Sequence, residues 1–177
     1  MDAAFRVLFV CLGNICRSPT AEGVFRRKLR EAGLSGLVEA DSAGTAAWHA
    51  GHPPDRRTQA EAARRGVDLS GLRARQVRAA DFQDFDLILA MDEDNLRDLK
   101  EKAPPSARAE LKLFLDFVPG SSSSARSKPR EVPDPYHGGP EGFAEVYDLC
   151  ASAADGLLEE TRRRVGPRRA SSSPKTS

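Results

Sequence analysis

The sequence predicts a small α/β domain, a doubly wound parallel sheet of about four strands with helices on both faces. Short, almost wholly apolar runs at residues 6–11 and 86–91 suit strands that are buried on both faces of such a sheet. A segment with helical periodicity follows each run, and this alternation is typical of a parallel sheet. The chain has 177 residues, of which 40% are hydrophobic and 30% charged, so it can build one core.

The first half of the chain contains two strand–helix pairs. The strand at residues 6–11 ends at a Gly13-Asn14 break, and Ser18-Pro19 is expected to begin a helix, with Ser18 as N-cap and Pro19 in the first helical position. Apolar residues then recur at helical spacing, and Gly33 ends the helix. A second strand is expected near residues 37–42, and a second helix from Pro53-Pro54-Asp55 to Gly66.

The second half repeats the pattern and ends in a polar tail. Further elements are a strand at 86–91, a helix from Asp92 to before Pro104-Pro105, a strand at 110–115, a loop over 119–133 and a helix from Pro140 to about Val165. Residues 166–177 contain no acidic residue and no periodicity, which predicts a disordered tail behind a domain of residues 1–165.

Composition narrows the function. The net charge is +1, so the chain has no excess of basic residues that would indicate a nucleic-acid partner. The apolar run at residues 7–12 is shorter than a signal-peptide core of roughly 7–15 residues or a membrane span of about 20. The cysteines at 11, 16 and 150 form no disulfide framework, and the three histidines lack metal-site spacing. We therefore expect a cytoplasmic monomer without metal or cofactor, with no nucleic-acid partner and no membrane span.

The turn after the first strand, residues 11–18, has the features of an oxyanion cradle. Ligands of such folds bind beyond the carboxyl ends of the strands. Gly13 and Asn14 tolerate left-handed backbone angles, which lets successive N–H groups point at one anion. Arg17 offers a planar fork for two phosphoryl oxygens, and the following helix adds its positive end. We expect Cys11 to be a thiolate here, able to attack bound phosphorus.

This turn resembles the signature of the low-molecular-weight protein tyrosine phosphatases, and the likeness runs from Val7 to about Leu158. Supporting stretches are residues 41–44, 74–77, 90–92 and 134–136, together with Trp48, Pro54-Asp55 and Asn95. The resemblance implies a metal-independent phosphatase that forms a phosphocysteine. Its partners would be phosphotyrosine-containing proteins, with small aryl phosphates as further substrates and inorganic phosphate as product. The phosphate would contact Leu12, Gly13, Asn14, Ile15, Cys16 and Ser18 of the turn.

Asp134 is the candidate general acid and base. Expelling a phenolate near pH 7 is slow, because a phenol has a pKa of about 10, and a carboxylic acid at the leaving oxygen accelerates the step. An Asp-Pro pair by itself is commonly a turn signal. The resemblance assigns the acid role to Asp134. It also places Trp48 and Tyr136 as aromatic walls of the substrate cleft, where the alternative is core packing.

The resemblance further implies supporting residues around the turn. Asn14, Ser18 and Ser42 would hold the turn in shape by hydrogen bonds, but a His that often joins this network is replaced by Leu72. Many relatives carry a second Tyr where this chain has His137, so regulation through that position is not expected. Cys11 and Cys16 would form a reversible protective disulfide, the alternative being that Cys16 is a small buried side chain. Cys150 is expected in the core.

Three other functions remain open. Relatives that act on phosphoarginine carry Thr at the position of Ile15, whose branched apolar side chain favours an aryl group instead. An arsenate reductase of the same fold needs further cysteines to pass on a disulfide, and residues 17–149 contain none. A phosphate-binding module without catalysis would be expected to lack Cys11 or Asp134, and both are present.

Overall fold

The computed structural model describes residues 4–120 and 130–171 of the chain. In order along the chain, the elements are β1 (Phe5–Cys11), α1 (Arg17–Glu31), β2 (Val38–Gly44), α2 (Arg56–Arg64), α3 (Asp81–Asp84), β3 (Leu87–Ala90), α4 (Glu93–Lys102), β4 (Glu110–Leu113), the 3₁₀ helix η1 (Phe114–Phe117) and α5 (Pro140–Ser171).

The four strands form one parallel sheet in the order β2-β1-β3-β4. β1 lies between β2 and β3, and Val10 pairs with Ala43 on one side and with Ala90 on the other. Six of the seven residues of β1 are buried and Arg6 is half-buried, as expected for a strand with helices on both faces. The predicted fold class is confirmed.

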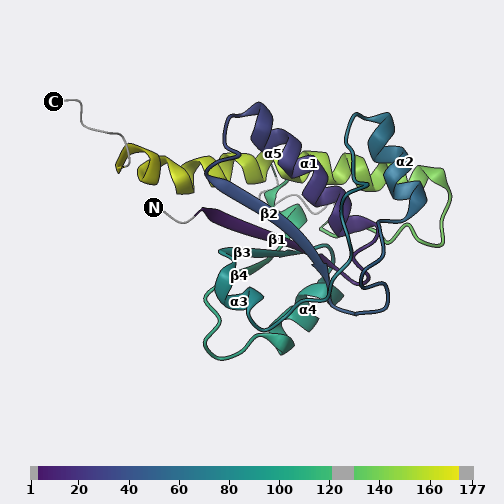
Figure 1. Ribbon diagram of the computed structural model, residues 1–177, viewed down its shortest axis with the longest axis horizontal. Coiled ribbons are helices and arrows are strands. Elements are labelled where there is room, and N and C mark those ends of the chain that lie inside the picture. The colour runs from purple at the N-terminus through teal and green to yellow at the C-terminus, as the bar shows by residue number, and fades with distance from the viewer. Residues whose placement is uncertain (1–3, 121–129, 172–177) are drawn as a thin grey trace.

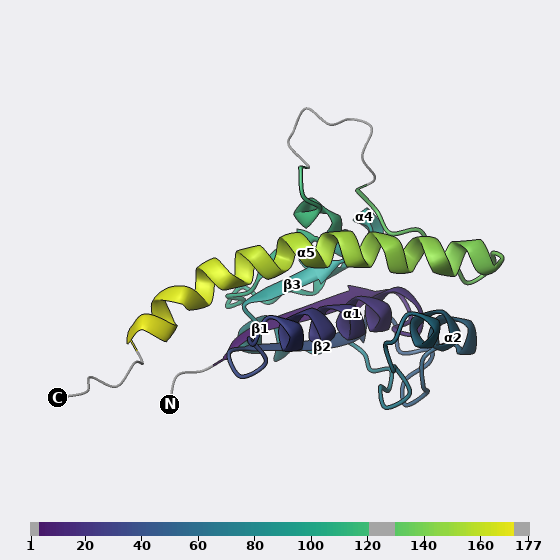
Figure 2. The ribbon, with the colours of Figure 1, turned by 90° about the horizontal axis from the view of Figure 1, so that it is seen from above.

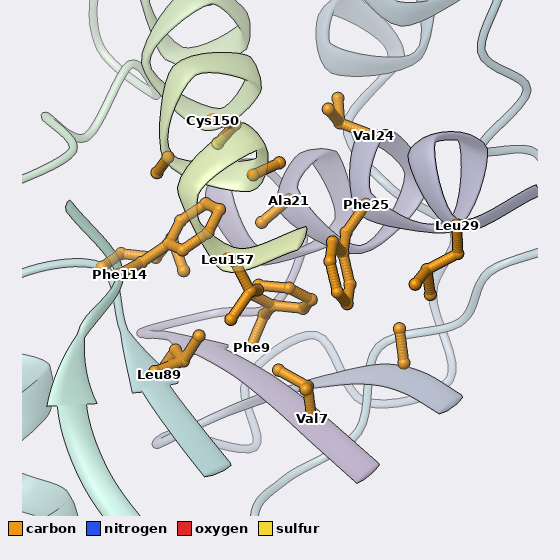
Figure 3. Packing of buried hydrophobic residues seen from close by; sticks show 14 of the residues in the cluster. Val7, Phe9, Ala21, Val24, Phe25, Leu29, Leu89, Phe114, Cys150 and Leu157 are labelled. Carbon is orange, nitrogen blue, oxygen red and sulfur yellow. The ribbon is translucent and has the colours of Figure 1, made fainter. Parts of the chain in front are cut away.

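Helices cover both faces of this sheet. In Figure 1, α1, α2 and α5 lie above the strands, and α3 and α4 lie below. The core on the first face contains Phe9 of β1. Its ring packs edge to face on Phe25 of α1 and on Phe114, at ring-centroid distances of 5.7 and 5.0 Å (Figure 3). Leu8 and Val10, which point the other way, pack with Phe82 and Leu99 in a second core.

The structure differs from the sequence expectations at four places. α1 begins at Arg17 instead of at Ser18-Pro19, with Cys16 as N-cap. The strand expected over 110–115 ends at Leu113 and turns into η1. The short helix α3 was not predicted. Finally, α5 continues to Ser171, so a disordered tail from residue 166 is wrong for residues 166–171, while 172–177 lie outside the described residues.

α5 is the longest element and runs alongside α1 (Figure 2). Its apolar face, with Cys150, Ala154 and Leu157, closes the first core against the sheet. Within the described residues, no helix combines the length and the apolar character that crossing a membrane requires.

Candidate active site

The site is built at the carboxyl end of β1. Cys11 is the last residue of that strand and is 2% exposed. Asn14 adopts the left-handed conformation, with φ of 57°, and its backbone N–H donates to the Cys11 Sγ over 3.3 Å. Because Asn tolerates this conformation better than other side chains, the predicted bend forms at the expected residue. The turn therefore curls around the Cys11 sulfur.

The backbone N–H groups of this turn are available to a ligand. Those of residue 13 and residues 15–18 donate to no acceptor among the described residues. Those of Arg17 and Ser18 belong to the first turn of α1, and the N-cap Cys16 provides no side-chain acceptor for them. Unpaired amides at a helix N-terminus beside a positive-φ bend form a site for an oxyanion, as the sequence predicts for residues 12–18.

The sequence predicts Ser18 as the N-cap of the helix, but this is wrong because the Ser18 hydroxyl is used within the turn. Its Oγ lies 3.1 Å from the Cys11 Sγ and accepts a hydrogen bond from the Asn14 Nδ2 over 2.8 Å. The same Nδ2 donates to the Ser42 Oγ over 3.0 Å. The structure thus brings together Asn14, Ser18 and Ser42, which the resemblance named as supports of the turn.

Arg17 is almost fully buried and is held by Asp92, a site residue that the sequence pattern does not reveal. Its Nη1 donates to the Asp92 Oδ2 over 2.5 Å and to the Val132 carbonyl over 3.3 Å. Burial alone would lower the pKa of Arg17, but the neighbouring Cys11 and Asp92 raise it above its ordinary value. The guanidinium is thus a fixed cation beside the Cys11 sulfur.

Asp134 is a second carboxylate close to Arg17. Its Oδ2 lies 3.9 Å from the Arg17 Nη2, and its side chain is half exposed. The Asp134 Oδ1 accepts the backbone N–H of Tyr136 over 3.1 Å, which fixes the direction of the carboxylate. Asp134 stands 123 residues after Cys11 in the chain, and the structure brings both into one cavity.

This cavity has a volume of about 210 Å³. Its lining residues are Cys11, Leu12, Gly13, Ile15, Cys16, Arg17, Trp48, His49, Asp134, Tyr136 and His137. Trp48 is 72% exposed and Tyr136 is 40% exposed, so the core-packing alternative for these two residues is wrong. His49 and His137 were not predicted to line the site. A larger groove of about 580 Å³, near Arg6 and Arg26, contains no residue of the turn.

The three cysteines are free thiols in different surroundings. Cys16 is buried beside Thr58, and burial raises its pKa to about 12, so it remains a protonated thiol near neutral pH. Cys150 is fully enclosed in the core as expected, and burial raises its pKa as well. Among the three, only Cys11 lies beside a buried guanidinium within the turn of free amides.

The arrangement can bind a tetrahedral oxyanion and act on it. The turn and Arg17 supply hydrogen-bond donors beside the Cys11 sulfur, and Asp134 lines the same cavity with a carboxylate oxygen 3.9 Å from the Arg17 Nη2. This combination of nucleophile, anion donors and proton donor is suited to transfer of a phosphoryl group to sulfur.

Known proteins are similar to this chain in sequence and in fold. A family model described as low molecular weight phosphotyrosine protein phosphatase matches residues 6–166. A Streptomyces coelicolor low molecular weight protein-tyrosine-phosphatase is 44% identical, over 94% of this chain and 99% of its own. The crystal structure of a protein tyrosine phosphatase from Entamoeba histolytica superposes with a TM-score of 0.82, at 36% identity, over 93% of this chain and 99% of that one.

A Drosophila arginine phosphatase is also similar, with a TM-score of 0.79 at 32% identity, over 87% of this chain and 96% of that one. The residues that the family model matches include the turn after β1 and nearly all of the sheet and its helices. By its sequence over residues 6–166 and by its fold, this chain belongs to the low molecular weight phosphotyrosine protein phosphatase family.

Proposed function

We propose that this protein hydrolyses phosphotyrosine in proteins, and small aryl phosphates, through a phosphocysteine on Cys11. The observation that carries the proposal is the position of the Cys11 sulfur. It lies within a turn of unpaired backbone amides, beside buried Arg17, in a cavity that Asp134 also lines. Membership of the phosphatase family supports the same activity.

In the first step, the Cys11 thiolate attacks phosphorus while the bond from phosphorus to the tyrosyl oxygen breaks. The amides of the turn and Arg17 bind the three remaining phosphoryl oxygens, whose charge they compensate. Protonated Asp134 donates its proton to the departing phenol oxygen. The products of this step are a neutral tyrosine side chain, phosphocysteine and an ionised Asp134.

In the second step, water attacks the phosphocysteine. The ionised Asp134 removes a proton from this water as its oxygen bonds to phosphorus, and the bond from phosphorus to sulfur breaks. Inorganic phosphate leaves, the Cys11 thiolate is regenerated, and Asp134 is protonated for the next cycle. Trp48 and Tyr136 line the mouth of the cavity, where they can contact the aryl ring of the substrate.

Hydrolysis of phosphoarginine is the second candidate, because the Drosophila arginine phosphatase shares this fold. Ile15 lines the cavity and presents a branched apolar side chain where a guanidinium would have to find polar partners. Arsenate reduction has weaker support, since Cys150 is enclosed in the core and Cys16 is the one other cysteine that lines the cavity with Cys11.

Turnover of matched phosphotyrosine, phosphoserine and phosphoarginine peptides in the presence of EDTA tests the proposal. We expect phosphotyrosine to be hydrolysed at least about tenfold faster than the other two, with no loss on chelation. Equal or faster turnover of phosphoarginine would replace the substrate class. Loss of turnover with EDTA would contradict the mechanism.

The proposal places this activity on a cytoplasmic monomer. Three free thiols within one chain are compatible with the reducing conditions of the cytoplasm. Sedimentation velocity of the purified protein tests the oligomeric state, and fractionation of the cells that express it tests the location.

A further inference from the structure

The hydrogen bonds that reach Cys11 have a definite direction, which begins at Asn14. The Asn14 Oδ1 accepts the backbone N–H of Arg75 over 3.0 Å. This contact fixes the amide orientation, because only an oxygen can accept that N–H. The two protons of the Asn14 Nδ2 therefore go to Ser18 and Ser42, and both serine oxygens act as acceptors there.

The proton of the Ser42 hydroxyl goes to Glu22, whose Oε1 accepts it over 2.7 Å. An ionised carboxylate can only accept hydrogen bonds, so Glu22 commits the Ser42 proton. The Ser18 oxygen already accepts from Asn14, which leaves its own proton for the Cys11 Sγ at 3.1 Å; the Ala43 carbonyl is further away at 3.5 Å. An ionised Glu22 thus leaves the Ser42 oxygen to accept from Asn14 alone. This contact helps to hold Asn14, and through it Ser18, in the orientation that directs the Ser18 proton to Cys11.

Glu22 is a carboxylate in an unfavourable place. It is 1% exposed, and burial raises its pKa, while the Ser42 hydroxyl and Arg26 lower it. The other charges that act on it are Asp41, which raises the pKa, and Arg75, which lowers it.

Arg26 is the cation nearest to Glu22. Its Nη2 lies 2.8 Å from the Glu22 Oε2 and donates its hydrogen bond to the Ala40 carbonyl over 2.7 Å. The Glu22 Oε2 accepts no hydrogen bond from the described residues, so Arg26 acts on it through charge. The Arg26 side chain is 48% exposed and borders the groove of about 580 Å³. The network therefore runs from the surface at Arg26 to the sulfur.

We infer that Arg26 is a positioning residue of the phosphatase reaction: it keeps Glu22 ionised and so, through Ser42, Asn14 and Ser18, keeps a hydroxyl proton directed at the Cys11 sulfur. The inference rests on the proposed function for its effect on turnover, but not for its effect on the thiol. Without Arg26, Glu22 takes up a proton at a higher pH and can then donate it to the Ser42 oxygen in competition with Asn14. The orientation of Asn14 and Ser18 toward Cys11 is therefore held less firmly as the pH falls.

The test compares Arg26→Met with the native protein over about pH 5 to 8. Met keeps an apolar stem of similar reach without the charge. We expect kcat/KM for an aryl phosphate to be about tenfold lower at the acidic end and nearly unchanged at the alkaline end. Arg26→Lys should behave as native. Arg30→Met, an exposed residue one turn further along α1 and on the same groove, is the matched control and should also behave as native.

A second variant separates this role from a structural one. Gln at position 22 cannot titrate, yet its amide oxygen can still accept the Ser42 proton. Adding Glu22→Gln to Arg26→Met should therefore restore the native shape of the pH profile. The inference would be overturned if Arg26→Met lowered kcat/KM by the same factor at every pH and if adding Glu22→Gln did not change that loss.

The rate at which iodoacetamide alkylates Cys11 gives a readout that needs no turnover. We expect Arg26→Met to slow alkylation at the acidic end, and Arg26→Met/Glu22→Gln to reverse the slowing. If the native protein failed to hydrolyse phosphotyrosine but showed this alkylation pattern, the proposed function would be wrong and the network would stand. If alkylation were identical in all variants at every pH, the network would be wrong.

Discussion

Asp92 performs two tasks with its two carboxylate oxygens. The Oδ1 accepts the backbone N–H of Asn95 over 2.7 Å and caps α4, and the Oδ2 binds Arg17. The residue that begins a helix behind β3 therefore also holds the guanidinium behind β1. Such a pairing follows from the adjacency of β1 and β3 in the sheet, whose carboxyl ends lie at one edge.

Asp92→Asn should separate these two tasks. Asn caps helices about as well as Asp, so α4 and the thermal stability should be largely retained. Loss of the carboxylate leaves buried Arg17 without its closest anion and frees it to move. We expect kcat/KM to fall about ten- to a hundredfold. Steady-state kinetics and inhibition by inorganic phosphate check this, and unchanged values for both would show that Asp92 does not position Arg17.

Asp134→Asn should slow hydrolysis according to the leaving group. Asn has a similar shape but donates no acidic proton, so phenols of high pKa should be affected by about 10²–10⁴-fold in kcat/KM. Phenols of low pKa leave unaided and should be affected little. A series of substituted phenyl phosphates measures the trend. An equal loss across the series would remove Asp134 from its role as acid.

The residues of the turn were predictable because their chemistry is local. Gly13, Asn14 and Arg17 stand within seven residues of Cys11, so the pattern is visible in the sequence. Asp92 and Glu22 were not selected, since their roles depend on partners at a distance. Asp92 meets Arg17 across 75 positions, and Glu22 meets Ser42 across 20. No spacing rule for a single helix or strand shows such contacts.

At the scale of elements, the start of α1 is set by the site. A Ser-Pro pair is a strong helix-start signal, yet the Ser18 hydroxyl binds within the turn and the helix begins at Arg17. The sequence places the starts of α2 and α4 at Asp55 and Asp92, and both residues are the N-caps of these helices. Asp92 can cap α4 and bind Arg17 because it has two oxygens, whereas the single hydroxyl oxygen of Ser18 is already used within the turn.

The contact between α5 and η1 is so close that it requires glycine. A Cβ built at Gly156 would lie 1.6 Å from the Phe117 carbonyl oxygen, so a side chain there forces the two elements apart. We expect Gly156→Ala to lower the free energy of unfolding by about 1–3 kcal/mol or more. Thermal and urea unfolding measure the loss.

Gly166→Ala is the matched control in the same helix, because a Cβ at position 166 meets nothing within 4 Å. This variant should raise the stability by up to about 1 kcal/mol, since Ala favours helix over Gly. If both variants shifted the stability equally, helix propensity alone would explain the result and the close packing at Gly156 would have no energetic role.

At the scale of the whole molecule, strand content and helix alternation were predictable, but the extent of α5 was not. Apolar periodicity fades after Leu158, which suggested an end near Val165, whereas the helix continues to Ser171. Backbone hydrogen bonds can extend a helix beyond its packed face, where no pattern of apolar residues marks it. The strand order depends on pairing between segments that are distant in the sequence, and local periodicity does not show which segments pair.

The packed domain should end near residue 166. Val165 is 2% exposed and Arg164 binds Glu110 over 3.0 Å, whereas a Cβ at Gly166 meets nothing. We therefore expect a chain shortened after Gly166 to keep its kcat/KM and a thermal midpoint within about 2 °C of the full chain. A chain shortened before Arg164 should lose several degrees, because it also lacks the buried Val165.

The central claim, that the sulfur of Cys11 takes the phosphoryl group, can be tested by trapping the intermediate. Asp134→Asn slows the attack of water on the phosphocysteine. A phenol of low pKa needs no acid to leave, so the first step stays fast and phosphoenzyme should accumulate. Rapid quenching during hydrolysis of para-nitrophenyl phosphate, followed by tandem mass spectrometry, locates the phosphate. We predict it on Cys11, with none in Cys11→Ser. Release of product with no phosphoenzyme, or with phosphate on another residue, would contradict the account.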